Sequence, residues 1–212
     1  MRKHIGWIAG TAAAALVAAG AITYAVAEDG GGGGGGGLSV PSADGADAGF
    51  ARDMAVHHQQ AVEMSYLVRD RTKNAEVRRL AYDIAQTQAN QRGMLLGWLD
   101  LWDLPKVSAK PPMSWMGMGD MPERGDGSLM PGMATDTELK KLGTLNGKQA
   151  EIFYLQLMTD HHKGGIHMAE GCVARCTIAV EKSLAQGMVD AQQSELTAMK
   201  QMLTERGARP RD

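Results

Sequence analysis

The feature that most constrains this fold is a repeat inside the chain. Residues around position 57 return around position 161, and the same shift of 104 positions holds over about fifty residues without a gap. The matched pairs are Met54 and Met158, His57 and His161, His58 and His162, Met64 and Met168, Gln88 and Gln192, Gln91 and Glu195, and Leu99 and Leu203. Each copy has the pattern of two helices, so the repeat predicts two helical hairpins that bury their apolar faces against each other.

Local signals predict where these helices begin and end. Asn74 is a suitable N-cap, Thr135 to Glu138 form a capping box, and Gly207 and Pro210 end the last helix. The expected long helices are 46–71, Asn74 to about Trp102, about Lys148 to Ala174, and about Val180 to Arg206, with a short helix between Thr135 and Asn146. The sequence therefore predicts an all-α four-helix bundle with a Met-rich central loop.

The N-terminal region has the composition of an export segment. Arg2 and Lys3 precede an uncharged apolar run from Ile5 to Ala27, long enough to cross a hydrocarbon layer of about 30 Å. Ala25-Val26-Ala27 is also a possible signal-peptide cleavage site. We therefore expect a cell-membrane protein with an extracytoplasmic domain, or a secreted protein if cleavage follows Ala27.

The expected domain organisation follows from these segments. Residues 1–27 are the transmembrane anchor or signal peptide, and 28–45 are a Gly-rich linker. Residues 46–207 are the bundle, divided into a first hairpin at 46–103, a Met-rich loop at 104–134 and a second hairpin at 135–207. The formal net charge of -2 argues against nucleic acid as a partner, because phosphate binding needs an excess of Lys and Arg.

The histidines fall in stripes along the predicted helices. Residues three and four apart share a helix face. Met54, His57, Ala61 and Met64 form one stripe, and Met158, His161, Gly165 and Met168 form its copy. His58 and His162 adjoin the two stripes, and His167 lies five residues after His162. These side chains are candidate metal ligands, which facing helices would bring together in the bundle core.

This donor set favours copper over other metals. Imidazole suits Cu, Zn, Fe and Ni, whereas thioether selects Cu(I), so we expect Cu(I) rather than Cu(II). A di-iron centre would need Glu-x-x-His on two helices, and this motif does not occur in the chain. The alternative is that the histidines are core residues held by hydrogen bonds, with Gln88, Gln91, Gln192 and Glu195 as partners.

Methionines are also concentrated in the loop between the hairpins. Met113, Met116, Met118 and Met121 lie close together there, followed by Met130 and Met133. An exposed thioether cluster of this kind can capture Cu(I). Alternatively, the loop packs these side chains and Trp115 over the bundle as a hydrophobic lid, or it binds a protein partner.

Cys172 and Cys176 are four residues apart near the end of the predicted third long helix. A disulfide is possible between them in an oxidising compartment, because this spacing lies within the allowed Cα–Cα range. Free thiols and metal ligands are the alternatives.

The segments Asp53 to Met64 and Met158 to Ala169 resemble the signature of a bacterial family known as domain of unknown function three-hundred-and-five. The segment 130–133 and the step from Gln192 to Glu195 are also similar to its members, and the resemblance covers about 48–203. It implies a ferritin-like four-helix bundle in secreted or membrane-anchored proteins. It also implies periplasmic copper binding, as linked to some members, at the Met and His positions named above. Gln91 departs from the pattern where the second copy has Glu195, and the two cysteines lie outside it.

Three functions are compatible with these patterns. The first is an extracytoplasmic metal-binding protein that captures, buffers or delivers copper. The second is a non-catalytic structural or interaction module whose histidines are hydrogen-bonded core residues. The third is a metal-dependent redox enzyme, which is disfavoured because no nucleophile–base arrangement, Gly-rich cofactor loop or full di-metal carboxylate set is visible. The sequence identifies no protein partner.

Overall fold

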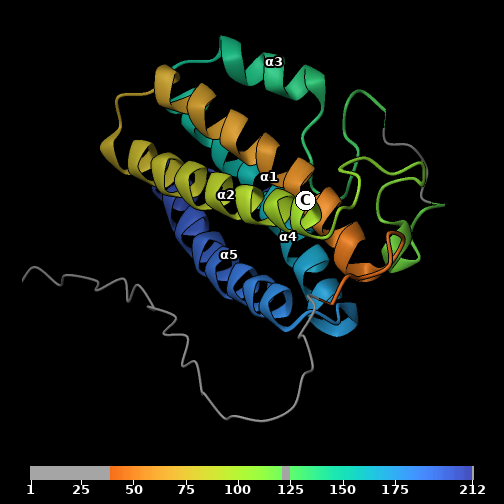
Figure 1. Cartoon of the computed structure of the whole chain (residues 1–212). Coiled ribbons are helices and arrows are strands. Elements are labelled where there is room, and N and C mark those ends of the chain that lie inside the picture. The colour runs from red at the N-terminus through yellow and green to blue at the C-terminus, as the bar shows by residue number, and fades with distance from the viewer. Residues whose placement is uncertain (1–38, 121–124, 212) are drawn as a thin grey trace, which may run out of the picture. The chain divides into compact units, whose positions relative to one another are not determined.

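The structure is a computed structural model that describes residues 39–120 and 125–211, and these residues are helical without any strand. Four long helices and one short α-helix are present in this part of the chain (Figure 1). Their bounds are α1 Ala46–Arg71, α2 Ala75–Leu101, α3 Asp136–Thr144, α4 Gly147–Arg175 and α5 Ala179–Glu205, with a single 3-10 turn, η1, at Ser114–Met116. The all-helical prediction is confirmed.

The predicted export segment, 1–27, and most of the linker, 28–45, lie outside the described residues. Among the helices that the structure describes, none is both long and apolar enough to cross a membrane.

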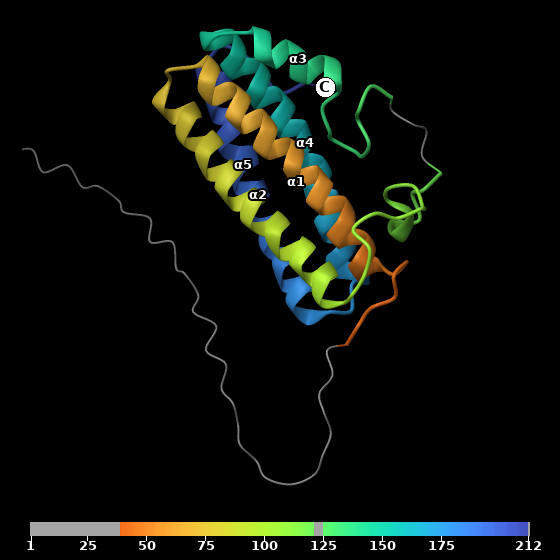
Figure 2. The same ribbon diagram turned by 45° about the horizontal axis from the view of Figure 1, so that its top comes forward.

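The four long helices form the two predicted hairpins. Helix α1 packs against α2, α4 packs against α5, and α1 packs against α4 to join the hairpins (Figure 2). A shift of 104 residues turns both bounds of α2 into those of α5, and the end of α1 at Arg71 into the end of α4 at Arg175. The sequence repeat is therefore a repeat of structure.

The predicted capping residues form the expected contacts. The Asn74 side chain accepts hydrogen bonds from the backbone N–H groups of Glu76 and Val77. Thr135 and Glu138 form a capping box that begins α3. After α5, Gly207 adopts a φ of +68°, a left-handed conformation that glycine reaches without the steric cost of a Cβ.

The apolar core is divided between the two ends of the bundle. One cluster contains the first half of α1, with Phe50 and Met54, and the last part of α4, with Met168 and Cys172. The other contains Met64 of α1 together with the Tyr154 end of α4. Helices α1 and α4 are therefore antiparallel, and their His-His pairs lie between the two clusters.

The loop between the hairpins is anchored on α1. The Asp53 carboxylate accepts hydrogen bonds from the backbone N–H of Met113 at 2.7 Å and from the indole N–H of Trp115 at 2.9 Å. Further along, Gln60 donates to and accepts from the backbone of Ala134. The described part of the loop therefore follows the surface of the bundle beside α1 (Figure 1).

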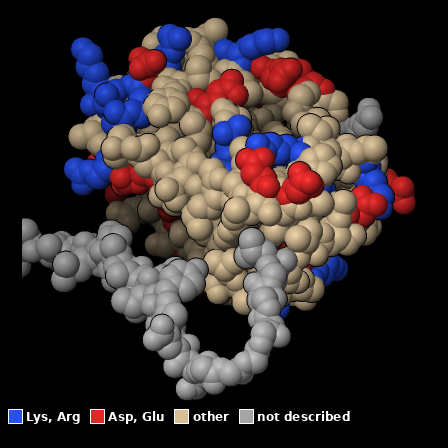
Figure 3. Space-filling model, viewed as in Figure 1, with Lys and Arg blue, Asp and Glu red and all other residues tan. Residues whose placement is uncertain are grey.

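Acidic and basic side chains are interspersed on the face of the molecule shown in Figure 3. This mixed surface agrees with the near-neutral formal net charge of -2.

Candidate metal centre

Four histidines form a buried group at the middle of the bundle. His57 and His58 come from α1, and His161 and His162 come from α4. All four are 0% exposed. The repeat predicted that these residues come together, and the structure places them side by side where α1 and α4 cross.

His57 and His161 are in direct contact. Their ring centroids are 3.7 Å apart, with an angle of 32° between the ring planes. The Nε2 of His161 lies 3.0 Å from the backbone oxygen of His57. A carbonyl oxygen can only accept, so this Nε2 carries the proton and Nδ1 of the neutral ring carries a lone pair.

His162 has a similar arrangement with a carboxylate. Its Nε2 lies 2.6 Å from Oε2 of Glu195 on α5. The carboxylate accepts this hydrogen bond, and Nδ1 of His162 has no protein partner. In the first copy, Gln88 and Gln91 lie near His58, but neither nitrogen of His58 has a partner in hydrogen-bond geometry.

Most ring nitrogens of these histidines have no hydrogen-bond partner. The six are Nδ1 and Nε2 of His57 and of His58, Nδ1 of His161 and Nδ1 of His162. Burial, followed by the influence of neighbouring histidines, lowers the pKa of His57 and His58 from 6.5 to about 3. Burial also lowers the pKa of His161 well below its ordinary value. These three rings are therefore neutral at pH 7, which is the form that binds metals.

The nitrogens of the group do not converge as a ready three-histidine site. Among the described residues, only one set of three His, Cys, Asp or Glu ligand atoms lies within 4.8 Å of one another, and it contains no histidine. The centroids of His57 and His58 are 6.5 Å apart, and those of His161 and His162 are 6.4 Å apart. Nitrogen ligands alone would therefore give a metal only one or two contacts without movement of the rings.

The four helix methionines of the predicted stripes are fully buried. Met54 and Met168 lie in one core cluster, and Met64 and Met158 lie in the other. Thioethers thus flank the histidine layer on both sides. Gly165, the small residue of the second stripe, packs against the Gln192 side chain, because a Cβ there would lie 2.4 Å from Oε1 of Gln192. The space beside Gly165 therefore accommodates the Gln192 amide.

His167 does not join the buried group. Its side chain is exposed and borders an open surface pocket together with Asp160, Lys163 and Arg211. The metal role predicted for His167 would therefore belong to a place separate from the other four histidines.

Of the loop methionines, Met113 is 0% exposed, which favours the lid alternative over an exposed thioether cluster. Met130 and Met133 are buried as well, and Met116 and Met118 are half-buried against the same core cluster. Two helix glycines make room for this packing. The Trp115 side chain lies directly over Gly49, and the Met116 side chain lies directly over Gly171. The arrangement corresponds to the lid alternative. Met121 lies outside the described residues.

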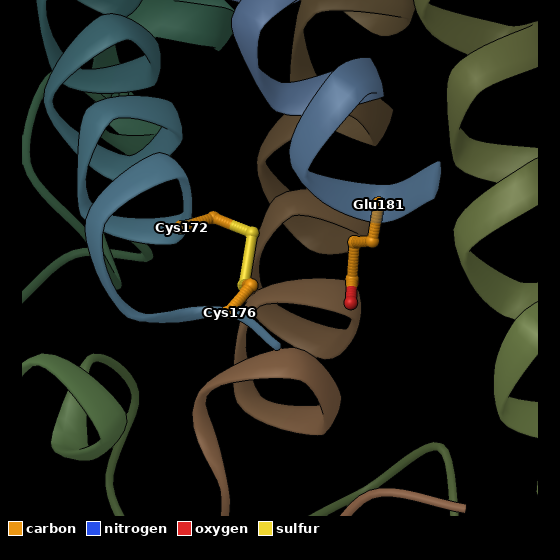
Figure 4. Close-up of side chains that lie close together, drawn as sticks. All are labelled: Cys172, Cys176 and Glu181. Carbon is orange, nitrogen blue, oxygen red and sulfur yellow. A yellow bond between two sulfur atoms is a disulfide. The ribbon is translucent and has the colours of Figure 1, made fainter. Parts of the chain in front are cut away.

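Cys172 and Cys176 form a disulfide, which was the first of the alternatives drawn from their spacing. Glu181, on α5, lies next to this disulfide and is 0% exposed (Figure 4). Sequence reasoning missed Glu181. The repeat contains the signal that could have identified it, because the equivalent position of the first copy is the buried Val77.

Comparison with protein families places most of the described chain in one family. Residues 47–203 match the family described as "Domain of unknown function (DUF305)". The chain belongs to the DUF305 family. No curated protein matches the chain.

Solved structures agree with this assignment. A candidate secreted DUF305 protein from Streptomyces coelicolor is 70% identical, with a TM-score of 0.76 over 81% of this chain and 99% of the other. A DUF305 fragment from Deinococcus radiodurans is 28% identical, with a TM-score of 0.62 over 76% of this chain and 96% of the other. CopM in its Cu(I)-bound form is 20% identical, with a TM-score of 0.58 over 75% of this chain and 96% of CopM. CopM therefore shares the fold of this DUF305 protein.

Proposed function

We propose that this DUF305 protein binds copper through its buried histidines and the adjacent methionines, and that it captures, buffers or delivers copper outside the cytoplasm. The observation that carries the proposal is the orientation of His161 and His162. In each, a protein oxygen binds Nε2 and leaves Nδ1 buried without a partner.

Unpartnered nitrogens at this depth need a physical reason. A buried polar group without a hydrogen bond costs on the order of 1–3 kcal/mol, and native proteins contain few such groups. A bound cation would give these nitrogens a partner. The hydrogen bond from His162 to Glu195 supports this assignment, because ligating histidines usually donate their second N–H to a carboxylate or carbonyl.

The donor set favours Cu(I) over Zn(II). A closed zinc site uses four ligands in tetrahedral geometry, whereas the imidazole nitrogens here do not converge in threes. The buried thioethers of Met54, Met64, Met158 and Met168 flank the histidines, and thioether is a soft donor that selects Cu(I). We therefore assign these four methionines as further donors. The loop residues Met113, Met116, Met118 and Met121 are secondary candidates, as is the exposed His167.

Two comparisons support the proposal. CopM has the same fold, and its solved forms contain Cu(I), Cu(II) or Ag. The Streptomyces coelicolor relative is described as a candidate secreted protein. An extracytoplasmic location of this chain would agree with that relative and with the apolar run at 5–27. Cleavage after Ala27 would remove the run and release the protein, whereas an uncleaved run would anchor it.

The competing function is a structural module whose histidines are hydrogen-bonded core residues. The bond from His161 to the His57 carbonyl favours it, because such a bond stabilises the crossing of α1 and α4 without any metal. The six unpartnered nitrogens are what this function does not explain.

Substitution of the central pair separates the two functions. His57→Ala and His161→Ala should each weaken Cu(I) binding at least tenfold, while the exposed His167→Ala serves as the matched histidine control and should have a smaller effect. Cu(I) affinity and the melting temperature of the metal-free protein are measured for each variant. Copper affinity unchanged in both core variants would reject the proposal and leave the structural function.

A further inference from the structure

A second group of metal-binding side chains lies at one end of the bundle, away from the histidines. Cys172 and Cys176 are at the end of α4, and Glu181 is in the first turn of α5. The two sulfurs and a carboxylate oxygen all lie within 4.8 Å of one another, and all three residues are buried. In Figure 4 the Glu181 side chain extends from α5 toward the disulfide, with α1 behind it.

The repeat provides an internal comparison for this group. The positions equivalent to Cys172, Cys176 and Glu181 in the first hairpin are Val68, Thr72 and Val77. Val68 and Val77 are fully buried apolar residues, so this place in the fold is compatible with an ordinary core. The second hairpin instead has two sulfurs and a carboxyl, which packing alone does not require.

The carboxyl of Glu181 lacks partners. Neither of its oxygens has a partner in good hydrogen-bond geometry, although the Asp47 carboxylate is nearby, and its side chain is completely buried. Burial, together with the neighbouring Asp47 carboxylate, raises the pKa of Glu181 to about 9. Asp47 itself accepts hydrogen bonds from the backbone N–H groups of Thr177 and Ile178, and from the Thr177 hydroxyl.

At the opposite end of the bundle, the equivalent buried carboxylate is paired with a basic side chain. Glu151 occupies the position equivalent to Asp47, and its Oε2 lies 2.7 Å from Nε of Arg206. Trp102 occupies the position equivalent to Arg206, and no ion pair of Asp47 or Glu181 is present among the described residues. The end with the cysteines therefore has two buried acidic groups without a matching cation.

We propose that the reduced protein binds a borderline divalent metal ion of the zinc type through Cys172 Sγ, Cys176 Sγ and Glu181 Oε, and that the disulfide closes this site. Two thiolates and a carboxylate are accepted zinc ligands. At a Zn–S distance of about 2.3 Å, tetrahedral geometry places two sulfurs about 3.8 Å apart. The disulfide must open for the sulfurs to reach that separation. The three ligand atoms already lie within 4.8 Å of one another, so a metal site needs only small movements of the side chains.

The chemistry of the switch is a thiol–disulfide exchange followed by ligation. A dithiol reductant gives two electrons and two protons to the Cys172–Cys176 bond and leaves as its own disulfide. The metal then replaces the protons of both thiols and of the Glu181 carboxyl, and these protons go to solvent. Neither step involves the histidines, so this site stands independently of the copper proposal.

The test is a titration of the full chain with Co(II), a spectroscopic substitute for Zn(II), followed by displacement with Zn(II). After reduction with a phosphine, we expect one equivalent of Co(II) to bind with thiolate-to-cobalt charge-transfer absorption in the near ultraviolet. The oxidised protein is the matched control and should lack this band. Helix content measured by circular dichroism accompanies each titration.

Variants assign the ligands. The double variant Cys172→Ser with Cys176→Ser should lose the band. Glu181→Val, which introduces the residue found at the equivalent Val77, should weaken Co(II) binding at least tenfold. His57→Ala should leave it unchanged. If reduction unfolds the protein, metal-induced recovery of helix content supports the site. A folded reduced protein without the cobalt band, or an unfolded one that metal does not restore, overturns the proposal.

Discussion

The rings of His57 and His161 lie against each other, with centroids 3.7 Å apart, although 104 residues separate them in the chain. These residues occupy equivalent positions in the two hairpins. When equivalent positions of two similar units touch each other, the contact lies near a twofold relationship between the units. The proposed copper site is therefore at the centre of the repeat, where both copies contribute donors.

The burial of the histidines predicts a pH-dependent stability. His58 has a pKa of about 3 in the folded protein against 6.5 when exposed, so the unfolded chain binds more protons between these values. The free energy of unfolding should therefore be highest above pH 6.5. As the pH falls from 6.5 towards 3, His58 should lower it by about 1.4 kcal/mol per pH unit. Urea denaturation at pH 7, 6 and 5 measures this slope.

The raised pKa of Glu181 acts in the opposite direction, because the folded protein then binds more protons above pH 4.5. The slope is therefore compared with that of His58→Gln, which retains Glu181 and removes one titrating histidine. Equal slopes in the two proteins would contradict a neutral, buried His58.

The Glu195 carboxylate should tune the metal affinity of His162. It accepts a hydrogen bond from Nε2 of His162, so Nδ1 is the nitrogen left for a metal. Glu195→Gln should lower Cu(I) affinity roughly 10- to 100-fold, as found for comparable outer partners of metal ligands. Gln91→Glu, the reciprocal change in the first copy, should not lower it. The measurement is competition with a Cu(I) chelator, and a Glu195→Gln variant with unchanged affinity would contradict the assigned role.

The close approach of the loop to α4 predicts a large cost for a small substitution. A Cβ at Gly164 would lie 2.0 Å from the backbone oxygen of Pro131. Gly164→Ala should therefore lower the free energy of unfolding by about 1–3 kcal/mol. Gly187→Ala is the matched control, because nothing lies within 4 Å of a Cβ there, and it should raise stability by roughly 0.5–1 kcal/mol. Chemical denaturation measures both, and equal effects would contradict this packing.

Asp53 should hold the Met-rich loop on the bundle. It accepts hydrogen bonds from Met113 and Trp115, and its loss would leave both donors unpaired. Asp53→Ala should lower the free energy of unfolding by about 1–3 kcal/mol and speed proteolysis of the loop. Asp83→Ala, an exposed change on α2, is the control. A loop cleaved at the same rate in all three proteins would show that Asp53 does not anchor it.

The sequence predicts most of the fold because the repeat, the caps and the helix stops are local signals. Asn74 and Thr135 illustrate this, since each forms the cap that its neighbours imply. The sequence left the burial of Met113 as one of two alternatives, because that burial depends on Asp53, sixty positions earlier in the chain. The contact of Glu181 with Cys172 and Cys176 forms only when α5 folds back on α4, although the repeat places Glu181 at the position of the apolar Val77.

In the candidate site, too, the sequence predicts local features but not the contacts between helices. The helix stripes predicted which histidines come together, since spacing alone determines the face of a helix. The hydrogen bonds of the individual ring nitrogens depend on how α1 and α4 cross, which spacing does not determine. The exposure of His167 does follow from spacing: it lies five residues after His162, on another face of α4.

The most direct measurement is an anaerobic Cu(I) titration of the metal-free full chain against a chromophoric chelator, with Zn(II) in parallel. The Cys172→Ser and Cys176→Ser double variant is used, so that the thiols do not contribute. The account predicts uptake of at least one equivalent of Cu(I), far more tightly than Zn(II), and a reduction of at least tenfold in His57→Ala. No competition with the chelator, or binding that does not depend on His57 and His161, would contradict it.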